Sequence, residues 1–301
     1  STENIRTNTN ATFLQNINIG VAITAGKLGI GFTDTNVKVG NTALDSLTVG
    51  SQNVAVGNNA LTANTSANDN TAVGHESLQT NTTGAQNAGL GHRTLQLNTT
   101  GSSNTAVGRQ SLRANTTASN NTAVGYHSLL SNTTGADNVA VGSGALDANT
   151  TASENTAVGK DALTDNTTGT SNTAVGRMAL GNNTTANGNT ALGTDAMFTS
   201  TTGADNTSVG HNSMFDNTTG SNNVAVGSYA LDANTTASNN TALGYNALTA
   251  TTTGADNTAV GQNALTANLA HSNTAVGRYA MNANTTGTEQ VAIGKGALST
   301  N

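Results

Sequence analysis

One short pattern of apolar and polar residues recurs along most of the chain. Its consensus, N-T-A-V-G-x-x-A-L-x-x-N-T-T-G-x-x, returns every 17 residues from Gly40 to Gly294, with one step of 16 that ends at Gly277. An Asn stands four residues before each of the sixteen registered glycines, from Asn36 to Asn273, with Gln290 the one exception. Leu or Met stands four residues after each, from Leu44 to Leu298. Such regularity indicates a repeat architecture.

The triplet before each glycine predicts a strand. T-A-V is replaced by V-A-V in several copies, at Val54–Val56, Val139–Val141 and Val224–Val226. Because side chains alternate between the two faces of a strand, the Thr or Val and the second Val point one way and the Ala points the other. The glycine then ends the strand at a corner that needs a permissive backbone, and Asn at fixed intervals suits the turns.

A period of 17 residues is shorter than helix-pair and leucine-rich repeats, and dense Asn, Thr and Gly disfavour helices. We therefore predict an all-β, parallel β-solenoid (a β-roll) with 17 residues per coil and about 16 coils, which gives a rod on the order of 75 Å long. The Leu and Met side chains form an internal row, and the repeated Asn form a ladder of side-chain hydrogen bonds. Thr105, Val107 and Leu112 are expected to face inward, and Asn104 and Asn121 to belong to one ladder.

The predicted cross-section is thin. Each coil buries roughly one Leu, one Val and a few small side chains, a modest apolar gain against the ordering of a whole coil. We therefore expect the solenoid to associate with itself as an intertwined or side-by-side homotrimer whose copies share their flat Ala-bearing faces. End-to-end stacking is a further expected contact.

The repeat divides the chain into two parts. Residues 36–301 form the solenoid, a shaft or head. Residues 1–35 break the register and contain the alternating segment FLQNINIGVAI, from Phe13 to Ile23. We interpret these residues as an attachment or capping segment that docks onto a baseplate, an anchor protein or the next subunit, since an uncovered end exposes unpaired strand edges.

Composition limits the partners. Only 9% of residues are charged, and Cys, Pro and Trp are absent. This composition alone is compatible with disorder, against which the strict repeat argues. The net charge of -6 and the scarcity of Lys and Arg argue against a nucleic-acid partner. No apolar run approaches the roughly 18 residues of a membrane span, so membrane insertion is not expected.

No motif for catalysis or cofactor binding stands in the chain: G-x-S-x-G, a P-loop and H-E-x-x-H are absent. His75 and His92 lie one coil apart, but no third metal ligand recurs in register. Asp137, Asp205 and Asp256 recur in G-A-D-N, without the glycine-aspartate nonapeptide of calcium-binding β-rolls. We therefore expect no enzyme activity, cofactor or metal, and a glycosidase-like carboxylate pair is the less favoured alternative.

The two residues after each registered glycine are the most variable of the repeat. They include all four Tyr and four of the five His. A variable, aromatic and cationic stripe along one corner is typical of a surface that binds sugars or surface polymers. The alternative is an outward corner that tolerates any soluble residue. The candidate contact residues are His92, Arg93, Arg109, Tyr126, His127, Arg177, Tyr229, Tyr245, Arg278 and Tyr279.

Three further features have a functional interpretation and a purely structural one. Phe198 and Phe215 occupy the same position in adjacent coils and are expected to stack, within a local apolar patch or across an interface between chains. The N-T-T and N-T-A triplets match the glycosylation sequon, but we interpret them as turn chemistry. Threonine ladders on a flat face suggest binding to ice. Adjacent Thr residues point to opposite sides of a strand, however, so only one of each T-T pair joins an outer row.

The run NTAVGxxAL, with its V-A-V and V-A-I variants, resembles the S-V-A-I-G-x-x-A repeat of trimeric autotransporter adhesin heads, which form left-handed parallel β-rolls in a tight trimer. It is still more similar to the N-T-A-V-G-x-x-A-L-x-x-N-T-T-G repeats of bacteriophage tail fibres. The stretch GKLGIGFTDTNVKVG, from Gly26 to Gly40, also resembles the first segments of such fibres.

The resemblance implies a structural fibre without catalytic activity. The leading expectation is a trimeric shaft or head of a virion tail fibre, which positions the particle for attachment to a host surface polysaccharide or protein receptor. A bacterial cell-surface adhesin or a self-assembling extracellular filament is the alternative, and an ice-binding solenoid is a minor one.

Overall fold

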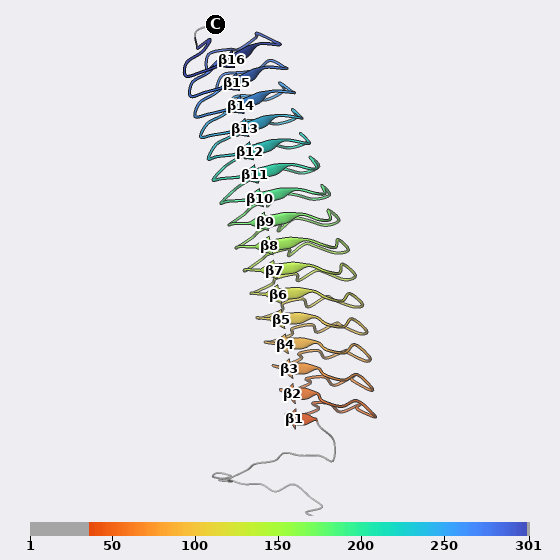
Figure 1. Cartoon of the computed structure of the whole chain (residues 1–301). Coiled ribbons are helices and arrows are strands. Elements are labelled where there is room, and N and C mark those ends of the chain that lie inside the picture. The colour runs from red at the N-terminus through yellow and green to blue at the C-terminus, as the bar shows by residue number, and fades with distance from the viewer. Residues whose placement is uncertain (1–35, 300–301) are drawn as a thin grey trace, which may run out of the picture.

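A computed structural model describes residues 36–299 of the chain. These residues form an all-β solenoid in which each coil contributes one strand of three residues to a single parallel sheet, in chain order (Figure 1). The predicted fold class and the 17-residue coil are confirmed. The predicted attachment segment, residues 1–35, lies outside the described residues.

The strands are β1 Val37–Val39, β2 Val54–Val56, β3 Thr71–Val73, β4 Ala88–Leu90, β5 Thr105–Val107, β6 Thr122–Val124, β7 Val139–Val141, β8 Thr156–Val158, β9 Thr173–Val175, β10 Thr190–Leu192, β11 Thr207–Val209, β12 Val224–Val226, β13 Thr241–Leu243, β14 Thr258–Val260, β15 Thr274–Val276 and β16 Val291–Ile293.

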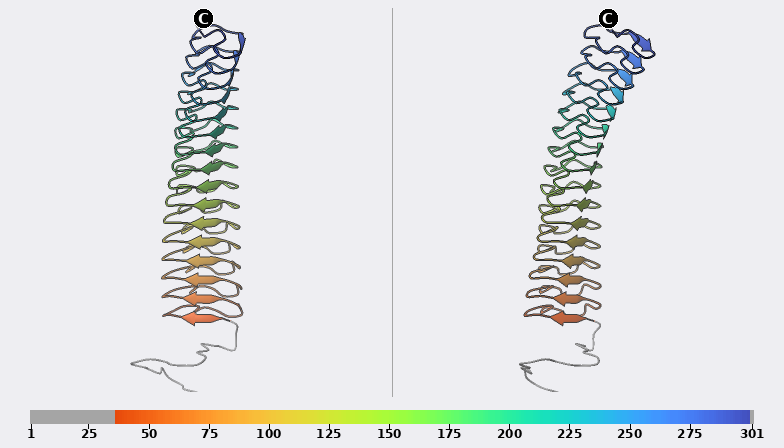
Figure 2. Two further views of the ribbon diagram at one scale, coloured as in Figure 1. Left: turned by 60° about the vertical axis from the view of Figure 1, so that its left-hand side comes forward. Right: turned by 90° about the vertical axis from the view of Figure 1, so that its left-hand side faces the viewer.

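Each coil stacks on the next in strict register. Thr105 of β5 pairs with Thr122 of β6, and the same residue-to-residue match holds along the sheet. Backbone hydrogen bonds also join the coils away from the sheet, for example from Leu112 N to Ser128 O at 2.9 Å. The result is a gently curved rod with all its strands on one side (Figure 2).

The predicted orientation of the strand side chains is wrong. The middle residue of the strand points inward, with Ala106 fully buried, whereas Val107 is 36% exposed and Thr105 is half-buried. Alternation shows which residues share a face but not which face is inside. The expectation that copies share Ala-bearing faces is therefore also wrong, since the Ala row lies inside the solenoid.

The reason is the lack of room behind the sheet. The small residue three places after each glycine, such as Ser77 or Thr94, occupies the interior opposite the strand. In β4 the inward residue is Gly89, where an added Cβ would lie 2.6 Å from Ser77 Oγ and 2.9 Å from Thr94 Oγ1. A methyl group is thus the largest side chain that most coils accept there, and valine is left outside.

The predicted row of large apolar side chains is confirmed. Leu112 is fully buried, as are its equivalents Leu61 and Leu265 and the methionines Met197 and Met214. These residues, the inward Ala row and the alanines that stand three places after the glycine in many coils form one apolar cluster along the rod. Each coil between Leu44 and Met281 thus contributes one large buried apolar side chain to the core.

The predicted Asn ladder is confirmed, and it uses each amide fully. Asn104 Nδ2 donates to Asn87 Oδ1 of the preceding coil at 3.1 Å and to Ala118 O of its own coil at 2.9 Å. In turn, Asn104 Oδ1 accepts from the backbone N of Asn121 at 3.0 Å. The side chains are buried, so these bonds replace water at every coil.

A second Asn ladder, which was not expected from the sequence, runs through the Asn that begins each N-T-T triplet. Asn98 Nδ2 donates to Asn81 Oδ1 at 2.7 Å and to Gly101 O at 2.9 Å. Gly101 O also accepts from Asn87 of the first ladder at 2.8 Å, so the two ladders meet on one carbonyl. The Asn of these triplets is buried, which agrees with their interpretation as turn chemistry.

The glycine corner is required by both conformation and space. Gly108 has a φ of 119°, and an added Cβ would lie 2.5 Å from the carbonyl oxygen of Gly125 in the next coil. The corners therefore stack with backbone against backbone, which only glycine permits.

The one short coil keeps both ladders. Asn257 Nδ2 and Asn268 Nδ2 both donate to Ala270 O, at 2.9 and 2.8 Å, as their equivalents do elsewhere. Ala270 follows Asn268 by two residues, whereas Ala118 follows Asn115 by three. The missing residue is the second Thr of the triplet, whose equivalent Thr117 is exposed.

We expect the first ladder to tolerate neither an apolar nor an ionised substitute. Asn121→Ala removes the acceptor of Asn138 and a donor to Gly135 O, and should cost about 2–5 kcal/mol of unfolding free energy. Asn121→Asp buries a carboxylate, so its loss should be larger at pH 7 and should shrink as acid neutralises the group. Urea unfolding followed by circular dichroism at pH 7 and pH 4 measures both. The exposed neighbour variant Asn120→Asp is the control, and equal effects at the two positions would contradict the ladder's role.

The second ladder has a gap that can be filled. Ser200 stands where most coils have Asn, and both Ser200 Oγ and Asn183 Oδ1 below it are buried without a hydrogen-bond partner. Ser200→Asn should restore the donor to Asn183 and raise the unfolding free energy by about 1–2 kcal/mol. The shift of the urea midpoint, compared with that of the exposed variant Ser171→Asn, tests this; equal midpoints would count against it.

Candidate functional surfaces

The two residues after each registered glycine, here called the corner stripe, form a turn with a fixed backbone. The second residue of each pair is left-handed, with φ of 58° at His127, Tyr229 and Tyr279. Asn, Asp and Gly tolerate this conformation best, and half of the coils have one of them there. The backbone conformation therefore limits which residues suit this position, and the coils with a large side chain there depart from its preference for Asn, Asp or Gly.

The first cluster of the corner stripe begins beside β3 and β4. The rings of His75 and His92 stack with centroids 5.3 Å apart. Arg93 Nε donates to Glu76 Oε2 at 2.6 Å, and Gln96 donates to the same oxygen at 2.8 Å. The hydrogen bond from Arg93 lowers the pKa of Glu76, while burial and then the charge of Arg93 lower the pKa of His92. The cluster thus contains an ion pair beside a His92 ring whose charged form is disfavoured by its surroundings.

The same cluster continues beside β5 and β6. Arg109 lies over the ring of Tyr126, 5.6 Å from its centroid, and Tyr126 stacks on His127 at 3.7 Å. His127 Nε2 lies 2.6 Å from Gln110 Oε1. A cationic and an aromatic group in contact offer both a charge and a flat apolar surface to a ligand.

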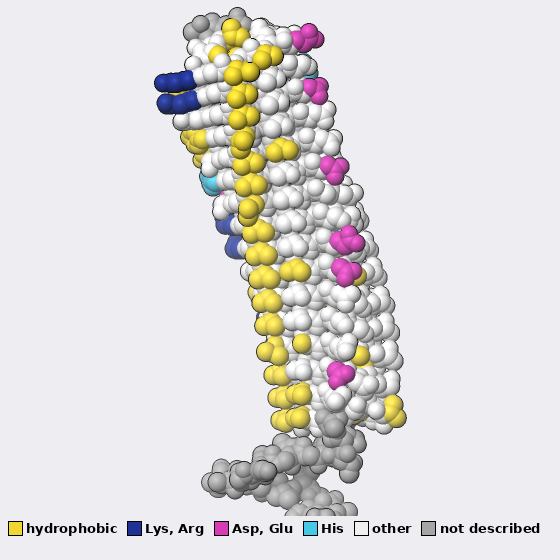
Figure 3. All heavy atoms as spheres, viewed as in Figure 1, with side chains coloured by type: hydrophobic (Ala, Val, Ile, Leu, Met, Phe, Trp, Pro, Cys, Tyr) yellow, Lys and Arg dark blue, Asp and Glu magenta, His cyan; other side chains and the backbone are white. Residues whose placement is uncertain are grey.

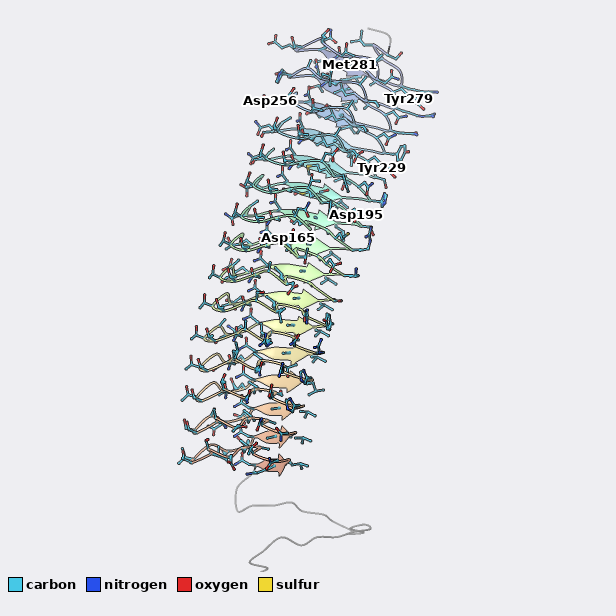
Figure 4. The ribbon with its side chains drawn as sticks, turned by 180° about the vertical axis from the view of Figure 1, so that it is seen from behind. Asp165, Asp195, Tyr229, Asp256, Tyr279 and Met281 are labelled. Atoms are coloured by element: carbon cyan, nitrogen blue, oxygen red, sulfur yellow. The ribbon has the colours of Figure 1, made fainter. Side chains whose placement is uncertain are left out.

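A second cluster lies further along the stripe. Tyr229 contacts His211 and Tyr245 edge-on, with centroid distances of 5.5 and 6.2 Å. Arg278 lies 4.7 Å from the centroid of Tyr279, and its hydrogen bond lowers the pKa of that phenol. Tyr229 and Tyr279 project from the same edge of the rod (Figure 4).

Ion pairs separate the two clusters. Arg177 Nη2 lies 2.6 Å from Asp195 Oδ2, and Lys160 Nζ lies 2.9 Å from Asp161 Oδ2. The structure therefore divides the predicted stripe into two aromatic groups with a charge-compensated stretch between them. That any of its residues contacts a ligand stays a prediction.

The outward residues of the strands form a further surface, here called the strand face, which was not expected from the sequence. Val, Leu or Ile occupies the third position of every strand and forms a continuous apolar line along the rod (Figure 3). Thr or Val fills most of the first position beside it. The sequence contained a signal for this arrangement. The middle position of the strand is Ala, Gly or Ser in nearly every coil, which indicates that this position, and not its neighbours, faces the confined interior.

Other predicted features lie as expected. Phe198 and Phe215 stack with centroids 5.5 Å apart, and Gly181 leaves room, since an added Cβ would lie 2.9 Å from the ring of Phe198. In the T-T pairs, Thr99 Oγ1 donates to Thr116 O of the next coil at 3.0 Å, while Thr100 is exposed. Only one residue of each pair thus joins an outer row.

Across residues 36–299, no three His, Cys, Asp or Glu side chains gather closely enough to hold a metal ion. The same residues contain no helix with the length and apolarity of a membrane span.

The resemblance to adhesin heads and tail fibres rests on the repeat residues alone. No protein-family model, curated protein or solved structure matches the chain.

A half-buried carboxylate beside the corner stripe gives a pH-dependent prediction. Burial raises the pKa of Asp147, partly offset by His127, and Asp147 Oδ1 has no hydrogen-bond partner in the described structure. The folded state therefore binds the proton more tightly, and stability falls as pH rises through the window above the ordinary carboxyl pKa. Asp147→Asn, which resembles Asn282 at the same position of a later coil, should stabilise the fold at pH 7 and have little effect at pH 3.

Urea midpoints at the two pH values measure this difference. Asp137→Asn, which changes an exposed carboxyl group, is the matched control and should shift the midpoint little at either pH. A stabilisation by Asp147→Asn of equal size at pH 3 and pH 7 would show that its cause is not the charge.

Proposed function

We propose that the chain is the shaft or head of a trimeric fibre on a virion tail, a structural protein that positions the particle for attachment to its host. The fibre reaches across a distance set by its stacked coils, and its corner stripe contacts the host surface. Residues 1–35 dock it onto a baseplate or anchor protein. This function requires no enzyme activity and no cofactor.

The strand face is the observation that carries the proposal. Val107, Val141 and Val158 are each 36% exposed, and Leu192 and Leu243 each 47%, in one line along the rod. Long contiguous apolar surfaces on soluble proteins mark interaction sites. A thin solenoid that places its valines outside gains buried apolar area when copies of the chain cover them. This face replaces the Ala-bearing face as the predicted contact of the trimer.

The two clusters of the corner stripe support the attachment role. Tyrosine and histidine rings stack against the flat faces of sugars, and Arg109 and Arg278 supply charge for acidic groups. A host surface polysaccharide or a protein receptor is the proposed partner.

Two alternatives share this fold. A cell-surface adhesin or a self-assembling extracellular filament uses the same rod and differs in where it is anchored. An ice-binding solenoid is favoured by one observation, the regular outward array of Thr and Val on the strand face. Ice binding needs this face uncovered, so it competes with the trimer for the same surface.

We expect light scattering to give a mass about three times the 29.9 kDa of one chain. Val107→Lys combined with Val141→Lys places two charges on the strand face and should reduce the mass to that of the monomer. Thr117→Lys combined with Thr151→Lys, at exposed turns of the same two coils, should leave the trimer intact. A monomeric wild type, or a strand-face variant that stays trimeric with an unchanged circular dichroism spectrum, would contradict the proposal.

Location separates the alternatives. Gold-labelled antibody against the chain should decorate phage tails in electron micrographs. Labelling of the bacterial surface without particles would instead favour the adhesin, and thermal hysteresis by a monomeric chain would favour ice binding.

A further inference from the structure

The first residue after each registered glycine forms one line of the corner stripe, here called the outer row, from Asn41 to Lys295. No acid occupies any of its sixteen positions, although the chain has 16 Asp and Glu residues and a net charge of -6. Lys or Arg occupies five of the positions: Arg109, Lys160, Arg177, Arg278 and Lys295. The outer row therefore carries only positive charge on an acidic protein.

Ion pairs decide how much of this charge is available to a ligand. Lys160 and Arg177 pair with acids that stand beside them in the corner stripe. Arg278 and Lys295 are exposed, and neither takes part in an ion pair within residues 36–299. The C-terminal end of the outer row thus has two unpaired cations one coil apart.

The surroundings of these two cations contain little that cancels their charge. Asp256 and Glu289 are the only acids from residue 233 to residue 299. Each stands two residues before a strand, whereas the outer row stands two residues after one, so a strand separates the acids from the cations. Figure 3 shows Lys and Arg side chains that project near the C-terminal end, with the acids on the other side of the apolar line. Figure 4 likewise shows Asp256 and Tyr279 on opposite edges of the rod.

Aromatic side chains lie beside the same cations. Tyr245 stands in the outer row two coils before Arg278 and is 48% exposed. The guanidinium of Arg278 lies over the ring of Tyr279, 4.7 Å from its centroid. Gln262 stands between Tyr245 and Arg278 in the row and is also exposed. These four residues and Lys295, here called the terminal site, cover four consecutive coils, roughly 14 Å along the rod at the spacing of stacked strands.

The terminal site combines the groups that an acidic sugar requires. A tyrosine ring offers an apolar face to a sugar ring, and its hydroxyl and the amide of Gln262 hydrogen-bond to hydroxyl groups. Arg278 and Lys295 form charge-assisted hydrogen bonds with carboxylates, which are stronger than bonds between neutral groups. Because the groups lie in one line along the rod, they fit a linear polymer better than a single small molecule.

We propose that the terminal site binds a linear polysaccharide whose sugars carry carboxylate groups. The inference rests on the attachment role in the proposed function and names the class of host polymer. The rest of the protein is acidic and repels such a polymer, so binding is confined to the unpaired cations. Each site is small and its contact weak, and three copies in one fibre raise the overall avidity.

Binding of defined oligomers to the full-length chain tests the ligand class. A fluorescently labelled galacturonic acid hexamer should bind at low salt by fluorescence anisotropy, and its affinity should fall as salt is added. Its methyl ester has the same sugar rings without the charges and should bind at least roughly tenfold more weakly. A glutamate hexamer has the charges without the sugars and should also bind more weakly. No binding of the galacturonate, or equal binding of either control, would overturn the inference.

Paired variants test the location. Arg278→Gln combined with Lys295→Gln introduces the residue that Gln262 already places in the same row, and should weaken galacturonate binding roughly tenfold. Lys160→Gln combined with Arg177→Gln removes the same charge from cations that are already paired, and should change the affinity little. Equal losses in the two double variants would show that net charge, and not the terminal site, governs binding.

The aromatic part of the site has its own variant. Tyr245→Ser keeps the charge and introduces a residue found at the same row position in other coils, such as Ser143. It should weaken galacturonate binding severalfold, and an unchanged affinity would contradict the contact with the sugar ring.

The two proposals fail separately. A chain that decorates phage tails but does not bind galacturonate would refute this inference and leave the proposed function standing. A chain that binds galacturonate but is monomeric or absent from phage tails would refute the proposed function, while the terminal site, which lies within one chain, would stand.

Discussion

Hydrogen bonds between stacked side-chain amides are the interaction on which this structure depends. Each coil contributes one or two buried Asn residues whose donors and acceptors are used by the coil itself and by its neighbours. A buried amide group without these partners would cost about 1–3 kcal/mol, which is similar to what the burial of one Leu side chain contributes. Because both ladders converge on the same carbonyl oxygen, the spacing from each Asn to that carbonyl is constrained. The short coil lacks one exposed Thr between the Asn residues and this carbonyl, yet both amides still donate to Ala270 O.

The same amides decide what faces water. They fill much of the interior, so the remaining space takes one Leu or Met, a methyl group on the strand and a small residue after the corner. The larger β-branched residues are forced to the outside of the sheet. In most small domains such residues would form the core. Here they form an exposed apolar line along the rod.

Much of this fold could be predicted from one sequence. The period, the strand, the glycine corner, the Leu and Met row and the first ladder all follow from residues that repeat at fixed spacing. The inward direction of Ala106 could not be read from alternation, because alternation is symmetric between the two faces. It depends on the volume left by Ser77, Thr94 and their equivalents, which becomes known only when coils are stacked.

The candidate surfaces were predicted less completely for a related reason. The corner stripe was visible because its residues vary, yet its division into two aromatic clusters depends on which side chains of adjacent coils touch. The ion pairs of Arg177 and Lys160 likewise depend on which side chains come together in the fold, and the sequence does not show this. The second ladder escaped notice because its Asn begin a triplet that also matches turn chemistry.

The direction of the hydrogen bonds has a mechanical consequence. Hydrogen bonds join each coil to the next along the long axis, so a pulling force on the two ends of the rod loads the layers in series and every layer bears the full force. Nearly identical layers would open at similar forces, one after another, and each would release a coil whose extended length is roughly 55 Å. A single rod under tension would therefore lengthen in even steps and dissipate work at each. Such behaviour resembles a damped tether more than a rigid strut, although compression and bending meet the full stiffness of the stack.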